Sequence, residues 1–334
     1  MGVKPRPYLK PLSWPFAAIT AVRNWAFDKG FLVSTRFTTP ILSVGNLSTG
    51  GTGKTPMVSY LLEHSKGKVA VLSRGYGRKT KGFIEVECFH KAEEVGDEPL
   101  EQKKRFPEAT IAVCEDRVAG VTELIRLYPN LSGIILDDAF QHRYLKPDSS
   151  LLLTPYDQLF TRDYVVPAGN LRESVSGANR ATAIIVTKCP EELSRNKKKE
   201  IQTELWNKAP LPVFFSRIVY TPNPKIEPNK KYLLVTGIEN PKPLASFLES
   251  RFVDFISMAF GDHHSFSPSD IDLIESTVKE NEVSGIITTA KDFTRLEPLH
   301  KESFPPLLVQ EITTELLHPE ALFEQLEFPP LKTH

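Results

Sequence analysis

The residues best suited to carry out chemistry lie in one glycine-rich stretch, residues 48–55. A short apolar run before it, at 41–44, predicts a buried strand, and apolar residues at helical spacing after it, at 57–62, predict a helix. A strand, a glycine loop, Lys-Thr and a helix are, in this order, the parts of a P-loop, which holds nucleotide phosphates. The predicted ATP-binding residues are Ser48, Thr49, Gly50, Gly51, Thr52, Gly53, Lys54 and Thr55.

Each residue type in this loop has a physical role. Glycines let backbone N–H groups turn toward phosphate oxygens, and the following helix adds the positive end of its dipole. Lys54 would contact the β- and γ-phosphates, and the Thr55 hydroxyl would ligate Mg²⁺. Two positions depart from the common patterns, because Ser48 replaces a glycine and Thr49 replaces the signature lysine of a P-loop variant. An ordinary glycine turn before a helix is the alternative, and the Lys-Thr pair at the helix start disfavours it.

Two adjacent carboxylates, Asp137 and Asp138, follow the apolar strand predicted at 132–136. A hydrophobic strand that ends in Asp places its carboxylate beside the Mg²⁺ of a P-loop. One of the two would bind the ion or its water, and the other would pair with Lys54 or shape the site. The residues alone do not decide which does which.

Further polar residues follow other predicted strands. Asp116, after the strand at 110–114, could accept a proton from a substrate hydroxyl, although a helix N-cap is the favoured reading of this residue alone. Arg74 and Arg78 lie in a glycine-rich loop after the strand at 68–73 that could bind an anion or be a solvated turn. His263 follows Asp262, which could orient its imidazole, and a purely structural role is equally open.

Composition limits the remaining options. The 334 residues contain 41 Lys+Arg and 41 Asp+Glu, so no overall basic footprint indicates a nucleic-acid partner. The three cysteines show no metal-binding spacing. Thr187-Lys188 resembles the start of a guanine-reading motif, but Pro190 replaces its Asp, which counts against GTP.

Alternating strand and helix patterns predict an α/β fold with a P-loop-type parallel sheet and a smaller second α/β/α unit. The expected boundaries are an N-terminal amphipathic region at 1–36, a P-loop domain at 37–210, an extended linker at 211–228 and a second domain at 229–334. The first region contains a tryptophan-rich helix with Trp14 and Trp25. It could lie in a membrane interface or pack on its own domain, and the residues leave this open.

Taken together, these motifs resemble the tetraacyldisaccharide 4′-kinases of lipid A synthesis. The resemblance is carried by collinear blocks over most of the chain: 43–56, 72–79, 96–99 (Gly-Asp-Glu-Pro), 115–117 (Glu-Asp-Arg), 136–143, 167–173, 261–264 and 288–292. It implies a peripheral enzyme on the cytoplasmic face of the bacterial inner membrane. The implied reaction uses ATP and Mg²⁺ to phosphorylate the 4′-hydroxyl of tetraacyldisaccharide 1-phosphate. No protein partner is implied.

The resemblance also implies roles for individual residues. Asp116 would be the general base, assisted by His263 from the second domain, and Lys54 would stabilise the transferring phosphate. Thr55 and Asp138 would ligate the metal, with Asp137 and Glu173 as further candidates. The arginines that would bind phosphates, including the 1-phosphate of the lipid, are Arg74, Arg78, Arg117 and Arg172. No role follows for Lys291 and Asp292.

Two other functions remain as alternatives. A nucleotide-dependent switch or metallochaperone-type NTPase also uses a glycine-rich P-loop, but Thr49 and the absence of a Cys/His cluster in the sequence disfavour it. A small-molecule kinase whose first helix only packs internally is the other. Binding to anionic vesicles would separate that reading from a lipid kinase.

Overall fold

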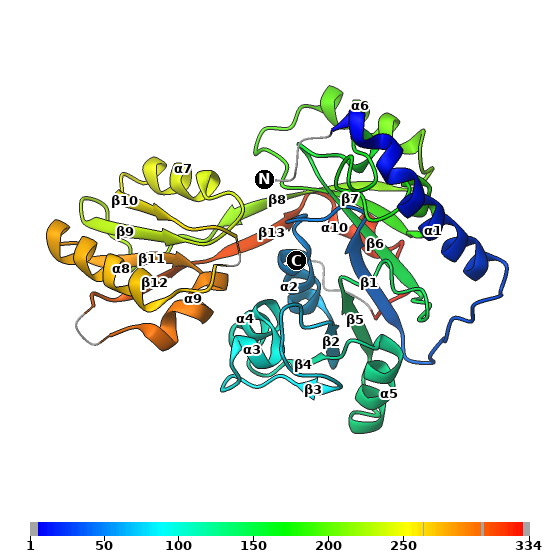
Figure 1. Ribbon diagram of the computed structural model, residues 1–334, viewed down its shortest axis with the longest axis horizontal. Helices are drawn as coiled ribbons and strands as arrows, with labels where there is room; N and C mark the ends of the chain where they lie inside the picture. The colour runs from blue at the N-terminus through cyan, green and yellow to red at the C-terminus, as the bar shows by residue number, and fades with distance from the viewer. Residues whose placement is uncertain (1–5, 263, 302–303, 330–334) are drawn as a thin grey trace.

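The computed structural model describes residues 6–262, 264–301 and 304–329, and these form two sheets with helices around them (Figure 1). The larger sheet has the order β13-β8-β7-β6-β1-β5-β2-β4-β3. Its strands are β1 (Ile41–Asn46), β2 (Val69–Ser73), β3 (Ile84–Glu85), β4 (Thr110–Val113), β5 (Gly133–Asp137), β6 (Ser149–Pro155), β7 (Ala183–Thr187), β8 (Val213–Tyr220) and β13 (Ile312–Leu316).

The smaller sheet has the order β10-β9-β11-β12, and all of its strand pairs are parallel. Its strands are β9 (Lys231–Thr236), β10 (Asp254–Ala259), β11 (Gly285–Thr289) and β12 (Leu307–Gln310). The helices are α1 (Lys10–Asp28), α2 (Lys54–His64), α3 (Ala92–Val95), α4 (Asp97–Arg105), α5 (Arg117–Leu127), α6 (Arg195–Trp206), α7 (Lys242–Ser250), α8 (Pro268–Asn281), α9 (Ala290–Leu296) and α10 (Pro319–Phe323).

The central strands of the larger sheet are mainly apolar and are buried along their whole length, because helices or loops cover both faces. Every residue of β1, β2, β5, β6 and β7 is buried, as is typical of parallel sheets. Strands β6, β1, β5, β2 and β4 run parallel. Their carboxyl ends therefore meet at one edge, which is where open α/β sheets bind ligands.

The connection between the two sheets differs from the predicted linker at 211–228. Residues 213–220 of this range form β8, which pairs with β7 and, antiparallel, with β13. These two strands run between the sheets in Figure 1, and β13 and α10 return the end of the chain to the larger sheet. We therefore propose two units with different limits: 37–220 with 312–329, and 231–310.

Helix α1 lies along the outside of the larger unit (Figure 1). Its inner face is fixed by polar contacts, in which Ser13 Oγ donates to the carbonyl of Val165 at 2.8 Å and Arg23 donates to that of Gln141 at 2.6 Å. Its other side chains are largely exposed and apolar: Leu12, Trp14, Ile19, Val22 and Trp25. The helix therefore exposes an apolar face on one side and makes polar contacts with the larger unit on the other. In the described residues, no helix combines the length and the apolar character needed to cross a membrane.

Candidate active site

The predicted P-loop joins β1 to α2, and its backbone has the turns that glycine permits. Gly50 and Gly53 have φ values of 108° and 85°, a region that disfavours other residues. Helix α2 begins at Lys54, directly after Gly53. Thr52 is anchored at both its carbonyl and its hydroxyl, which accept hydrogen bonds from Thr187 Oγ1 at 2.7 Å and Asn46 Nδ2 at 2.8 Å. The loop is thus held in a defined conformation by hydrogen bonds at the N-terminus of a helix.

The segment 165–173 packs along the start of this loop. The N–H of Thr49 donates to the carbonyl of Asn170 at 2.8 Å, and the N–H of Arg172 donates to that of Leu47 at 2.7 Å. This pairing brings the side chain of Arg172 to the carboxylate of Asp138, whose two oxygens each accept from Nη1 at 3.1 Å. Lys54 Nζ lies 3.8 Å from Asp138 Oδ1. Two cations predicted from distant parts of the sequence therefore converge on one aspartate.

The two adjacent aspartates have opposite environments. Burial acts to raise the pKa of Asp138, but the charges of Lys54 and Arg172 outweigh it and lower that pKa. Burial raises the pKa of Asp137 to about 7, and the charge of Glu98 adds to this effect. Asp137 Oδ1 is buried with no hydrogen-bond partner. A buried, unpartnered carboxylate oxygen is costly, so this atom has the character of a ligand for a cation.

These residues fit a magnesium ion held in the usual manner of nucleotide enzymes. Magnesium keeps several waters and takes only one or two protein carboxylates beside substrate phosphates. In the described part of the chain, no three His, Cys, Asp or Glu side chains converge on a metal position. Asp137, Asp138 and the half-buried Thr55 in the first turn of α2 supply the smaller set that magnesium uses.

Glu173, the further metal candidate, is already bonded to other side chains. It is buried, and its oxygens accept from Arg180 at 2.7 Å, Asn24 of α1 at 2.8 Å and Gln141 at 3.2 Å. The geometry favours a role in fixing α1 and the loop of Arg172 over a role as a ligand. Sequence reasoning could not foresee this, because the three donors come from three separate segments.

Asp116 adopts the N-cap role that its residue type favoured. It is exposed, and its Oδ1 accepts hydrogen bonds from the N–H groups of Val118 at 2.9 Å and Ala119 at 3.2 Å at the start of α5. It lies near His142, whose pKa is lowered to about 4 by burial and then by the charge of Arg117, with Arg23 and Arg74 acting in the same direction and Asp116 opposing. The charges of Asp116, Arg74 and Arg117 therefore all act on His142, which is neutral near pH 7.

The predicted phosphate-binding arginines divide into two groups. Arg74 is exposed, and Arg172 is partly exposed beside Asp138. Arg78 is instead paired with Glu115 and donates to the carbonyl of Gly82 at 2.8 Å, which fixes its own loop. Arg117 is buried and donates to three backbone carbonyls: those of Cys114 and Glu115, which follow β4, and that of Asp137 at the end of β5. Arg74 and Arg172 are thus the better placed to meet a ligand.

Two carboxylates that the sequence analysis left without a role, Asp97 and Glu98, lie in the first turn of α4. The charge of Glu98 acts on Asp137, whereas Asp97 is paired with Arg295 of the second unit. Arg295 also donates to the carbonyl of His264 at 3.5 Å. Asp97 is thus connected to the segment that carries His263. The sequence block 96–99, which is part of the family resemblance, could have pointed to Asp97 as a functional residue. It was given no role because turns rich in carboxylates are common.

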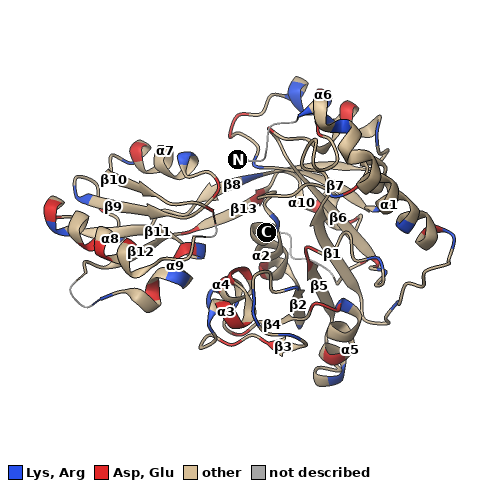
Figure 2. Cartoon of the chain, in the orientation of Figure 1, with Lys and Arg blue, Asp and Glu red and all other residues tan. Residues whose placement is uncertain are grey.

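His263 itself lies outside the described residues. Its neighbour Asp262 pairs with Lys291 at 3.3 Å, and His264 Nε2 lies 2.9 Å from Asp270. Asp292 is fully buried and accepts from the N–H of Gly237 at 2.8 Å. Lys291 and Asp292, which the sequence left without a role, therefore hold the loops of the second unit together. Figure 2 shows charged residues of both signs on α4 and α9, where the units meet.

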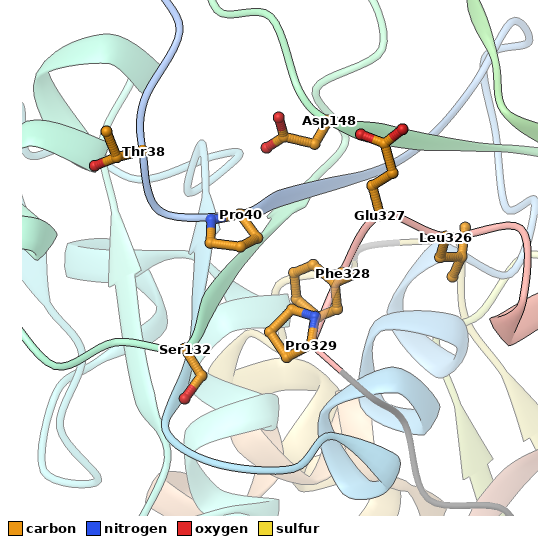
Figure 3. A pocket seen from close by; sticks show the side chains of 8 residues that line it. All are labelled: Thr38, Pro40, Ser132, Asp148, Leu326, Glu327, Phe328 and Pro329. Carbon is orange, nitrogen blue, oxygen red and sulfur yellow. The ribbon is translucent and has the colours of Figure 1, made fainter.

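The structure also contains a pocket of about 580 Å³ at the opposite edge of the larger sheet (Figure 3). Asp148 and Ser132 lie at its rim, next to the amino ends of β6 and β5, and Phe328 and Pro329 close one side. Because the P-loop is at the carboxyl ends of these strands, the pocket is separate from the candidate active site.

A glycine loop that opens a helix at Lys54, with a buried aspartate ending the neighbouring strand β5, defines this chain as a P-loop nucleotide-binding protein. Comparison with known proteins narrows this class. The family model for Tetraacyldisaccharide-1-P 4'-kinase matches residues 5–328. The chain therefore belongs to the tetraacyldisaccharide 4′-kinase family, and the predicted family and enzyme class are confirmed.

Individual relatives agree with this assignment. The tetraacyldisaccharide 4′-kinase of Flavobacterium johnsoniae is 41% identical over 303 residues, which cover 87% of this chain and 88% of the relative. That of Cytophaga hutchinsonii is 43% identical over 304 residues, which cover 88% and 86%. The crystal structure of an "apo" form of LpxK from Aquifex aeolicus in complex with ATP has a TM-score of 0.74 and 28% identity, over 96% of this chain and 98% of that one. The predicted fold class is confirmed.

Proposed function

We propose that this protein transfers the γ-phosphate of ATP to the 4′-hydroxyl of tetraacyldisaccharide 1-phosphate, a step of lipid A synthesis, with Mg²⁺ bound beside the nucleotide. The observation that carries the proposal is the meeting of Lys54, Arg172 and Asp138 beside the P-loop in a chain that matches this kinase family from residue 5 to 328. Phosphoryl transfer depends mainly on positioning and on neutralising charge. These side chains supply both.

The P-loop residues 48–55 would hold the ATP phosphates, with Lys54 at the β- and γ-phosphates. Thr55, Asp137 and Asp138 would hold Mg²⁺, which neutralises charge on the phosphates when it is bound. Asp137 has the buried, unpartnered oxygen, and Asp138 has the two cations. Asp137 would therefore serve Mg²⁺ alone, whereas Asp138 would also align Lys54 and Arg172.

The acceptor hydroxyl needs a base, and two aspartates compete for this role. The family resemblance implies Asp116, with His263 as its partner from the second unit. Asp97 is the second candidate, because Arg295 connects it to the segment 261–264 and because the neighbouring Glu98 acts on Asp137. A base that works with His263 must face the second unit, which favours Asp97. Arg74 and Arg172 would bind phosphate groups of the substrates.

Helix α1 supports the choice of a lipid substrate. Its outer face exposes Trp14 by 70% and Ile19 by 69%, while its inner face contacts the loops of Glu173 and Gln141. Apolar side chains in such numbers on one helix face are typical of an interfacial helix. We propose that α1 docks on the cytoplasmic face of the bacterial inner membrane and presents the candidate active site to a lipid in that membrane.

Replacing both Trp14 and Ile19 with Glu is expected to lower partitioning to anionic lipid vesicles at least tenfold, because two apolar side chains leave the interface. Cosedimentation with vesicles measures this. Trp206→Glu on α6 is the matched control, since Trp206 is also exposed, by 56%, and lies on another helix. Equal vesicle binding by wild type and the α1 variant would show that α1 does not dock.

The function is tested by phosphate transfer from γ-labelled ATP to tetraacyldisaccharide 1-phosphate in mixed micelles. We expect a labelled lipid bisphosphate that forms with Mg²⁺ and disappears with EDTA. ATP turnover by folded protein without any labelled lipid would contradict the lipid-kinase proposal and would favour a nucleotide-dependent switch. Transfer to a water-soluble sugar with no requirement for micelles would favour the small-molecule kinase.

A further inference from the structure

Glu239, in the loop that follows β9 of the second unit, contacts the P-loop. Its Oε2 accepts a hydrogen bond from the backbone N–H of Gly51 at 3.2 Å. From the larger unit, Lys188 Nζ donates to the carbonyl oxygen of the same glycine at 2.5 Å. Gly51 is therefore held at both of its backbone groups, by one residue from each unit.

The contact depends on the lack of a side chain at Gly51. A Cβ at this position would lie 2.8 Å from Glu239 Oε2, a separation that requires something to shift, and 3.6 Å from Lys188 Nζ. At the neighbouring Gly50 a Cβ would lie 3.8 Å from Glu239 Oε1. The carboxylate thus lies against the backbone of the glycine pair, in space that a substituted loop would fill.

The N–H groups of a P-loop are the donors that receive nucleotide phosphates. Glu239 places an anion on one of these donors, where a phosphate oxygen would otherwise bind. A carboxylate and a phosphate cannot share that donor at hydrogen-bond distance, since their charges repel and each needs the same N–H. Nucleotide phosphates and Glu239 therefore exclude one another at Gly51.

We propose that Glu239 is an autoinhibitory latch that occupies the phosphate-binding loop and is displaced by the β- and γ-phosphates of the nucleotide. The proposal rests on the nucleotide site of the proposed function. Because Glu239 belongs to the second unit and the loop to the first, displacement links nucleotide arrival to a movement of the β9 loop. The ion pair Asp97–Arg295 joins α4 to α9, and the ion pair Lys104–Glu297 joins α4 to the residue that follows α9. These two pairs can keep the units together while the latch opens.

The test compares nucleotides that differ in their phosphates. Binding of ATP, ADP and AMP, each with Mg²⁺ and without lipid, is measured by calorimetry for wild type, Glu239→Gln and Glu239→Ala. Removing the competing anion is expected to tighten ATP and ADP by about tenfold, the effect of one charge-assisted hydrogen bond. AMP lacks the phosphates that compete with Glu239, so its affinity is expected to stay unchanged.

Glu249→Ala provides the matched control, since Glu249 is an exposed carboxylate on α7 of the same unit. Circular dichroism confirms that each variant is folded. Unchanged or weaker binding of ATP and ADP by both Glu239 variants, with wild type binding normally, would overturn the latch alone. Absence of ATP binding by wild type as well as the variants would contradict the nucleotide site, and with it both proposals.

Discussion

Replacing Lys54 with Met is expected to lower kcat for phosphate transfer about a thousandfold, the loss seen when one preorganised donor to transition-state charge is removed. Methionine keeps the length and apolar stem of the side chain but has no charge to place on the transferring phosphate. The measurement is initial rate against ATP concentration in the mixed-micelle assay. Because Lys54 also lies 3.8 Å from Asp138, some weakening of Mg²⁺·ATP binding is expected too.

The fold is expected to tolerate this change. Asp138 keeps its hydrogen bonds from Arg172, and a partly exposed ion pair contributes at most about 1 kcal/mol. Lys66→Met, in the exposed turn after α2, serves as the matched control and should retain wild-type activity. A folded Lys54→Met protein with more than a tenth of wild-type kcat would remove this lysine from the chemistry.

Local sequence patterns predict those parts of the candidate site whose residues are neighbours in the sequence. The P-loop could be predicted because glycine positions, Lys54 and the following helix all lie within one short stretch. Asp137 could be placed because a strand that is apolar throughout ends at that residue. In both cases the chemistry depends on neighbours in sequence, and the loop keeps the geometry that its residue types require.

Local sequence patterns do not predict the partners of Arg78 and Glu173. Nothing near Arg78 in the sequence indicates that it pairs with Glu115 across 37 positions, nor that Glu173 is bonded by Asn24 of α1. Tertiary packing determines these partners. A charged residue whose type suggests that it binds a ligand can therefore be paired with another side chain of the protein. The pairing of β8 with β13 is likewise non-local, which is why the proline-rich segment at 211–228 reads as a linker.

Asp97→Asn is expected to lower kcat a hundredfold or more, within the range for losing a general base, while Asp116→Asn is expected to stay within about tenfold of wild type. The reason is position. Asp97 is connected through Arg295 to the segment of His263, whereas Asp116 uses Oδ1 to cap α5. Rates with and without saturating ATP separate a loss of chemistry from a loss of binding.

Two variants at Asp116 separate its role as the N-cap of α5 from a role as a charged proton acceptor. Asn is as good an N-cap as Asp, so Asp116→Asn removes only the charge and the proton acceptor, whereas Asp116→Ala also costs about 1 kcal/mol of stability. If Asp116→Asn is nearly inactive while folded and Asp97→Asn is active, the base is Asp116, as the family resemblance implies. In that case Arg295→Gln, which removes the ion pair with Asp97, should leave kcat unchanged. If Asp97 is the base, the same variant should alter the pH profile of kcat, because the charge beside the proton acceptor is lost.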